Sequence, residues 1–170
     1  MIDPLTTSET SRAAYELVTE HLGHRDVVAV IYTHSHLDHY GGILGVVDQE
    51  RIQAGEIPIV APEGFMVEAV SENIIAGPAM IRRSIYQMGM FLPWSSTGHV
   101  DSGLGKGIAA GSSALVPPTI EITETGQKLV LDGVPVEFQL TPETEAPAEM
   151  HFYFPVIFES RELVFTNSWI

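Results

Sequence analysis

The chain has 170 residues, of which 45% are hydrophobic and 18% are charged, a composition typical of one globular domain. Its net charge is −14, with 8 Lys and Arg against 22 Asp and Glu. This balance argues against a nucleic-acid partner, because phosphate binding depends on cationic side chains. The absence of cysteine excludes disulfides and thiolate ligands, so any metal ion must be held by histidine and carboxylate groups.

The sequence contains no targeting signal. Nowhere does it approach the roughly 18 to 20 consecutive apolar residues of a membrane span. The N-terminus, residues 1–4, lacks the basic and apolar regions of a signal peptide. We therefore expect no membrane span and assign no compartment.

The first third of the chain predicts alternating helices and strands. Thr6 and Glu9 have the spacing of a capping box, and apolar residues then recur at helical spacing until Gly23. The elements predicted next are a strand over 27–32, a helix over 43–54 ended by Gly55, and a buried strand over 57–61. Strand, helix and strand with short links are typical of an α/β layered fold.

A cluster of metal-ligand residues follows the first predicted strand. Residues 33–42 read Thr-His-Ser-His-Leu-Asp-His-Tyr-Gly-Gly and contain His34, His36, Asp38 and His39. In an extended segment His34 and His36 point to the same face and can bind one ion, while Asp38 and His39 lie at a bend and can face a second. Imidazole and carboxylate are ligands that zinc prefers. A polar loop without a metal is the alternative, disfavoured because three imidazoles this close repel once protonated.

Residues 63–90 predict further helix, with Pro78 suited to a first helical position. The segment is rich in methionine, which adapts to irregular apolar shapes. These methionines either line a lipid-like substrate pocket or pack in the core, and the second reading is favoured. They are Met66, Met80, Met88 and Met90.

The sequence from residue 93 onward predicts a long loop followed by an antiparallel sheet. Residues 93–118 are rich in glycine and serine, and loops this long are usually functional or disordered. Asp132-Gly133 is a strong hairpin signal. The strands predicted around and after it cover 129–131, 134–140, 151–154 and 163–166.

Several polar residues outside the cluster have an ordinary expected role. His21 and His24 flank the end of the first helix, and we expect a capping or surface role for both. We expect His99 at the surface and His151 packed and hydrogen-bonded. Arg82 and Arg83 could meet an anion, but a solvated helix face is favoured. Among three acids in a Pro-rich loop, Glu143, Glu145 and Glu149, spacing does not distinguish a metal ligand from solvated groups.

The cluster at 34–39 resembles the His-x-His-x-Asp-His motif of the metallo-β-lactamase superfamily. Flavodiiron members have Glu at the second position, so His36 favours zinc over iron. More closely, the segments Tyr-Thr-His-Ser-His-Leu-Asp-His-Tyr-Gly-Gly, Ala-Pro-Glu-Gly-Phe, Ser-Glu-Asn and Thr-Glu-Ala-Pro-Ala-Glu-Met resemble the linear and secondary alkylsulfatases of that superfamily. The resemblance covers nearly the whole chain and implies an αββα sandwich, two zinc ions and Glu145 as a ligand of the first.

Two departures from these alkylsulfatases affect the expectation. Where they have a second glutamate that bridges the ions, this sequence has Asn167, whose neutral amide would be a weak metal contact. They also continue for several hundred residues, through a further zinc histidine, sulfate-binding basic residues, a dimerisation domain and a sterol-carrier-like domain. We therefore expect residues 1–170 to form a partial catalytic domain, incomplete at both ends.

The resemblance implies a zinc-dependent hydrolase of alkyl sulfate esters, impaired in this form. His34, His36 and Glu145 would hold one ion, and Asp38 and His39 part of the other, with Asp38 as the predicted catalytic residue. We expect a small-molecule alkyl sulfate as substrate and a homo-oligomer. One alternative is another hydrolase of this fold acting on a carbonyl ester, thioester or lactam. A second alternative is a non-catalytic metal-binding remnant.

Overall fold

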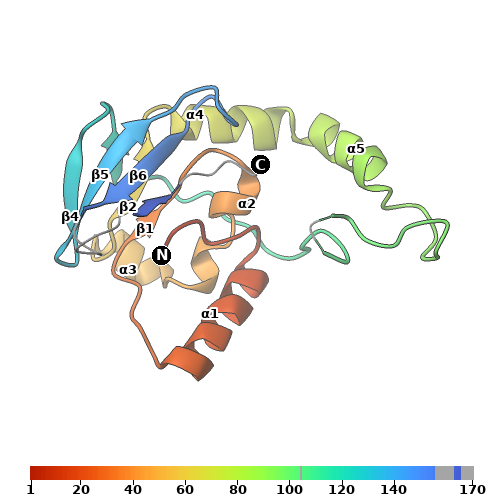
Figure 1. Ribbon diagram of the computed structural model, residues 1–170, viewed down its shortest axis with the longest axis horizontal. Helices are drawn as coiled ribbons and strands as arrows, with labels where there is room; N and C mark the ends of the chain where they lie inside the picture. Colours follow the sequence, from red (N-terminus) through yellow and green to blue (C-terminus); the bar gives the residue numbers. More distant parts are fainter. Residues whose placement is uncertain (104, 156–162, 166–170) are drawn as a thin grey trace.

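The computed structural model of the protein describes residues 1–103, 105–155 and 163–165. Helices lie on one side of a parallel sheet, and an antiparallel sheet packs on its other side (Figure 1). The parallel sheet has the order β1 (Val30–Ile31), β2 (Ile59–Pro62) and β3 (Ile120–Ile122). The antiparallel sheet has the order β4 (Lys128–Leu131), β5 (Val134–Leu140), β6 (Met150–Phe154) and β7 (Leu163–Phe165).

The parallel strands β1 and β2 are buried on both faces, which explains their continuous apolar sequence. All four residues of β2 are buried. The predicted strands at 27–32 and 57–61 are confirmed in position, but β1 is shorter than predicted. Its free edge pairs with the N-terminus, since the Ile31 amide donates to the Met1 carbonyl and the Asp3 amide to the Ile31 carbonyl, both at 3.0 Å.

The core consists of two clusters separated by the parallel sheet. On the helical side, Tyr32 stacks on Phe65 at 5.0 Å between ring centroids, and Tyr40 meets the same ring edge-on at 5.4 Å. Between the sheets, Ile31 and Ile122 of the parallel sheet belong to one buried cluster with Phe138 of the antiparallel sheet. The described residues thus form a layer of helices, the parallel sheet and the antiparallel sheet, in that order. These are three of the four layers of the predicted αββα sandwich.

Helix α1 (Ser8–Leu22) is confirmed and ends at Gly23, but the predicted capping box is wrong by one residue. Thr7 is the N-cap, because it has extended dihedrals and its hydroxyl accepts from the Thr10 amide at 3.2 Å. Glu9 has a different partner. Its carboxylate accepts from the Ser112 amide at 2.8 Å, which ties the end of the long loop to α1.

The single helix predicted over 43–54 is wrong. Asp48 has an extended conformation (φ −71°, ψ 136°) that interrupts the helix and begins a new one. Two glycines before it lie directly against the N-terminal backbone, where a Cβ on Gly42 would collide with the Pro4 carbonyl and one on Gly45 with the Ser8 carbonyl. The elements between β1 and β2 are α2 (Leu37–Tyr40), the 3-10 turn η1 (Ile43–Gly45) and α3 (Gln49–Gln53).

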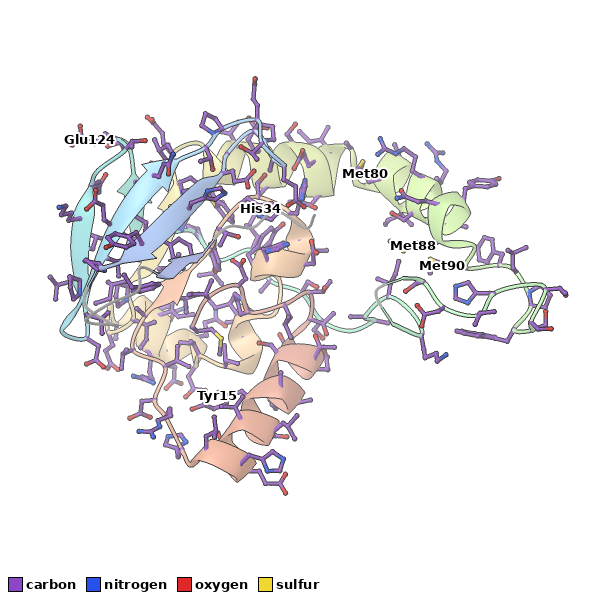
Figure 2. All side chains as sticks on the ribbon, in the orientation of Figure 1. Tyr15, His34, Met80, Met88, Met90 and Glu124 are labelled. Atoms are coloured by element: carbon purple, nitrogen blue, oxygen red, sulfur yellow. The ribbon has the colours of Figure 1, made fainter. Side chains whose placement is uncertain are left out.

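The helical segment predicted over 63–90 is confirmed, as α4 (Phe65–Val70), the π-helical turn η2 (Ser71–Ile75) and α5 (Gly77–Met88), with Pro78 in the first turn of α5. Helix α5 and the chain after it project from the body (Figure 1). Figure 2 shows Met80, Met88 and Met90 along this projection, away from His34, and Met80 and Met90 are 39% and 46% exposed. Core packing therefore holds for Met66 and not for Met80 or Met90.

The prediction that His99 lies at the surface is wrong. The side chain is 7% exposed and meets the edge of the Trp94 ring at 4.5 Å between centroids. Its amide donates to the Pro93 carbonyl at 2.9 Å. The loop after α5 therefore folds on itself around this histidine, a contact that its glycine- and serine-rich sequence did not indicate.

The predicted antiparallel sheet is confirmed. Asp132 (φ 51°) and Gly133 (φ 78°) both have positive φ, as the tight turn between β4 and β5 requires. β6 pairs with β5 and β7 with β6, both antiparallel. Within the residues that the structure describes, every helix is too short or too polar to cross a lipid bilayer.

Replacing Gly42 by Ala should lower the free energy of unfolding by about 1–3 kcal/mol, because the new methyl group would overlap backbone that cannot rotate away. Urea denaturation measures the change. Gly77→Ala is the control, since no heavy atom lies within 4 Å of its Cβ position, and it should leave the stability unchanged or slightly raised. Equal stabilities for the two variants would contradict this account of the packing.

Candidate metal centre

The predicted ligand residues gather shortly after the end of β1, around His34, which is labelled in Figure 2. His34 lies three residues after the last residue of β1 and forms an antiparallel bridge with Glu149. The Met150 amide donates to the Thr33 carbonyl at 3.0 Å, so the beginning of β6 holds the ligand loop in place. The two sheets thus meet at this point, and the acidic loop before β6 lies beside the histidines.

Three donor atoms from His34, His36 and Glu145 form a compact triangle. His34 Nε2 lies 3.0 Å from His36 Nδ1, and Glu145 Oε1 lies 3.8 Å and 3.6 Å from these two nitrogens. A tetrahedral ion at zinc bond lengths would need ligand atoms about 3.3 Å apart. The observed separations fit such an ion without large rearrangement. The structure therefore brings together the three residues predicted for the first ion.

The protonation of His34 suits a metal ligand. The side chain is fully buried, and burial, followed by the neighbouring His39 and His36, lowers its pKa from 6.5 to about 3. Nδ1 lies 3.1 Å from the Thr33 hydroxyl, so the ring is also oriented. A neutral imidazole has a lone pair available for a cation at neutral pH.

Asp38 and His39 lie beside this triangle. The ring centroids of His34 and His39 are 3.9 Å apart, and His39 Nε2 lies 3.4 Å from Asp38 Oδ2. Hydrogen bonding to His39 is the main cause that lowers the pKa of Asp38. The pair offers one imidazole and one carboxylate toward a second ion. The catalytic role of Asp38 stays a prediction.

Asp3 is a site residue that the sequence reasoning missed. Its carboxylate lies 2.8 Å from His39 Nδ1 and accepts from the Thr33 amide at 2.9 Å and the Thr33 hydroxyl at 2.6 Å. Burial opposes the charged form of His39, but the bonds to Asp3 and Asp38 prevail and raise its pKa to about 10. Asp3 lies more than 30 positions from the motif, and its local sequence carries no ligand signal.

The acidic loop that spacing left undecided separates into three roles. Glu145 faces the histidines, whereas Glu149 is 1% exposed and its Oε2 accepts from the Glu145 amide at 2.6 Å and the Ala146 amide at 3.0 Å. Glu143 is exposed. The buried carboxylate of Glu149 thus fixes the loop that presents Glu145. His151 was expected to be hydrogen-bonded, but its Nε2 has no such partner among the described residues and lies 3.9 Å from Glu149 Oε1.

The remaining predicted residues lie away from the site or outside the described chain. Asn167, the possible weak metal contact, lies outside the described residues. His24 is exposed and lies 3.0 Å from the exposed Asp26, as expected for a helix end. Arg82 and Arg83 are exposed on α5, in agreement with a solvated helix face.

The family is established by sequence comparison. The sequence pattern described as "Metallo-beta-lactamase superfamily" matches residues 1–158. The chain belongs to the metallo-β-lactamase superfamily. A solved structure of low sequence identity shares only the fold with this chain. The metallo-β-lactamase MIM-2 has a TM-score of 0.53 at 17% identity, and the match covers 97% of this chain and 48% of that one. The α/β metallo-β-lactamase fold predicted from the motif is confirmed.

Within this superfamily the chain is similar to alkylsulfatases. A linear primary-alkylsulfatase from Pseudomonas sp is 50% identical over 153 residues, which are 90% of this chain and 23% of that protein. The alkyl/aryl-sulfatase BDS1 from Saccharomyces cerevisiae is 49% identical over 155 residues, 91% of this chain and 24% of that one. The solved structure of the stereoselective inverting sec-alkylsulfatase Pisa1 from Pseudomonas sp. has a TM-score of 0.83 at 47% identity, covering 90% of this chain and 24% of that chain. The chain thus spans about a quarter of the length of these relatives.

The pairing of Asp3 with His39 predicts a pH dependence of stability in metal-free protein. Because folding raises the pKa of His39 from 6.5 to about 10, the charged pair stabilises fully below pH 6.5, and this stabilisation is lost as the pH rises through 10. Asp3→Asn should reduce the slope of unfolding free energy against pH in this window, measured by urea denaturation after chelation. Asp26→Asn, at the exposed pair with His24, should leave the slope unchanged. Equal slopes for Asp3→Asn and the unsubstituted chain would contradict the assignment.

Proposed function

We propose that this chain supplies the metal-holding part of a zinc-dependent hydrolase of alkyl sulfate esters. One observation carries the proposal. In a chain about half identical to alkylsulfatases, His34, His36 and Glu145 offer donor atoms that all lie within 4.8 Å of one another. Two imidazoles and a carboxylate match the ligand preference of zinc.

In this proposal each residue has a separate task. Bound zinc would activate water and polarise the sulfate ester. His34, His36 and Glu145 hold the first ion, and Asp38 and His39 contribute to the second, with Asp38 as the catalytic residue. Asp3 keeps the proton on His39 Nδ1, which leaves Nε2 free to bind once its own proton is displaced.

We further propose that residues 1–170 alone are impaired in turnover. A sulfate ester is an anion, and a preorganised cation beside the leaving group commonly accounts for about a hundredfold or more in rate. In the described part of the chain, the acids Asp38, Glu72 and Glu145 form ion pairs with histidine and not with Lys or Arg. Asn167 at the second ion would weaken the shell further.

We expect His36→Ala to abolish stoichiometric zinc binding, because it removes one of three donors to the first ion. His24→Ala removes an imidazole from an exposed position at the helix end and should bind zinc like the unsubstituted chain. Zinc per purified chain, measured by atomic absorption, distinguishes the two. Unchanged zinc in the His36 variant would refute the ligand assignment, and two tight sites in a calorimetric titration would refute the weak second position.

The substrate class is tested in a chimera, because the chain alone is expected to turn over poorly. The chimera replaces the matching segment of the Pseudomonas linear primary-alkylsulfatase with this chain, and sulfate release from dodecyl sulfate is measured. We expect chelator-sensitive release that His36→Ala abolishes and His24→Ala does not. A folded, zinc-loaded chimera without activity would favour a non-catalytic metal-binding remnant. Sulfate release by the 170-residue chain itself would overturn the proposed impairment.

We also propose that the chain self-associates through the projecting segment at 77–110. This segment exposes large apolar side chains, among them Tyr86 at 88%, Phe91 at 83% and Trp94 at 63%. It also carries three of the chain's eight cationic residues against one acid, whereas the whole chain has a net charge of −14. A second copy therefore offers an oppositely charged body to this apolar and basic surface.

Light scattering at micromolar concentration should give a dimer or a larger assembly. The double variant Tyr86→Ser, Phe91→Ser should shift the mass toward the single chain, because it removes the two most exposed rings of the segment. Val130→Ser is the matched control, since Val130 is 69% exposed on β4 of the body, and it should leave the assembly unchanged. A mass of 18.5 kDa for the unsubstituted chain would contradict self-association.

A further inference from the structure

Glu72 approaches the ligand His36 from an unusual piece of backbone. It lies in η2, the π-helical turn over Ser71–Ile75 between α4 and α5. Such turns are rare and often occur at functional sites, because the extra residue redirects the side chains around it. Here the turn carries Glu72 Oε2 to 3.7 Å from His36 Nε2.

The turn is tied to the ligand loop through Ser35, the buried residue between the two histidines. The Ser35 hydroxyl donates to Glu72 Oε2 at 3.3 Å. The side-chain amide of Asn73 donates to the Ser35 carbonyl and to the Ala69 carbonyl, both at 3.0 Å. These bonds tie η2 to the ligand loop and keep the Glu72 carboxylate beside His36.

The two ring nitrogens of His36 face different groups. Nδ1 lies 3.0 Å from His34 Nε2 and 3.6 Å from Glu145 Oε1, whereas Nε2 points to Glu72. A neutral imidazole has one N–H and one lone pair, so binding an ion through Nδ1 requires the proton on Nε2. The separation of 3.7 Å is within about 1 Å of an N–H···O hydrogen bond, a gap that a small rotation of either side chain closes.

We propose that Glu72 is a positioning residue that holds His36 in its Nε2–H form and so presents Nδ1 to the metal ion. The inference rests on the proposed metal site. A carboxylate that accepts from the second nitrogen of a ligating histidine fixes both the tautomer and the ring orientation. Glu72 does not belong to the group of described donors that share one ion position, which are those of His34, His36 and Glu145.

Zinc titration calorimetry on the full chain tests the role. Glu72→Ala should weaken binding of the first zinc roughly 10- to 100-fold without changing its stoichiometry. Glu72→Gln should lose less, because the amide oxygen still accepts from Nε2–H. The matched control is Glu68→Gln, which removes the same charge one helical turn earlier, on α4, and should bind zinc like the unsubstituted chain.

A second measurement reports the tautomer itself. In ¹⁵N spectra of metal-free, histidine-labelled protein, we expect the His36 proton on Nε2 in the unsubstituted chain. In metal-free Glu72→Ala we expect the proton distributed over both nitrogens, a change that a general loss of stability would not produce. If the Ala variant does not fold, Glu72→Leu takes its place, because it also lacks an acceptor for Nε2–H but fills more of the space.

The outcomes separate this inference from the proposed metal site. Zinc affinity lost in His36→Ala but unchanged in Glu72→Ala would overturn the role of Glu72 and leave the site intact. A cobalt-loaded Glu72→Ala protein whose absorption shows one ligand fewer would also overturn it, since Glu72 would then bind the ion directly. No zinc binding by the unsubstituted chain would overturn both.

Discussion

The hydrogen bond from the Met150 amide to the Thr33 carbonyl is the contact on which the candidate metal centre depends. It joins the segment just after β1 to the first residue of β6, at the point where the two sheets converge. His34 and His36 follow Thr33 in the sequence, and Glu145 precedes Met150. A single backbone pairing therefore sets the distance between the imidazoles and the carboxylate. Any shift in this register would separate the three donor atoms, whatever the local conformation of the motif.

Burial and charge make this junction suited to a cation. The imidazole of His34 is kept neutral by its burial, while His39 is held protonated between two carboxylates. Asp3 and Asp38 lie against His39, and Glu145 lies against His34 and His36. In a partly buried site, carboxylates are stabilised by a nearby positive charge, which protons on histidine supply in part and a divalent ion supplies more fully. The metal and the proton on His39 Nε2 thus compete for the same lone pair.

Two further acids, Glu149 and Glu72, support the predicted ligands Glu145 and His36. Glu149 accepts two loop amides and fixes the backbone that carries Glu145, while Glu72 reaches the outer nitrogen of His36 from η2. One acts through the backbone and the other through a side chain. By contrast, α5 and the loop after it expose most of their apolar side chains. The ligand cluster therefore lies in the packed body of the chain, whereas the projecting segment leaves its apolar side chains exposed.

The sequence by itself determined the elements whose signal is local. The short apolar runs predicted the strands, Asp132-Gly133 predicted the hairpin, and the spacing of His34, His36, Asp38 and His39 predicted the metal-ligand cluster. Each of these signals depends on residues a few positions apart. Glu145 needed the resemblance to alkylsulfatases, since spacing did not distinguish it from Glu143 or Glu149.

Only the tertiary structure decided the contacts between distant segments. Asp3 and Glu72 lie more than 30 positions from the histidines that they approach. The burial of His99 and the projection of α5 were likewise missed, and the helix predicted over 43–54 is interrupted at Asp48. Short-range patterns report which face of a segment is apolar. They carry no information on which distant backbone closes against it, and at Gly42 and in η2 that packing fixes the position of the side chains around the site.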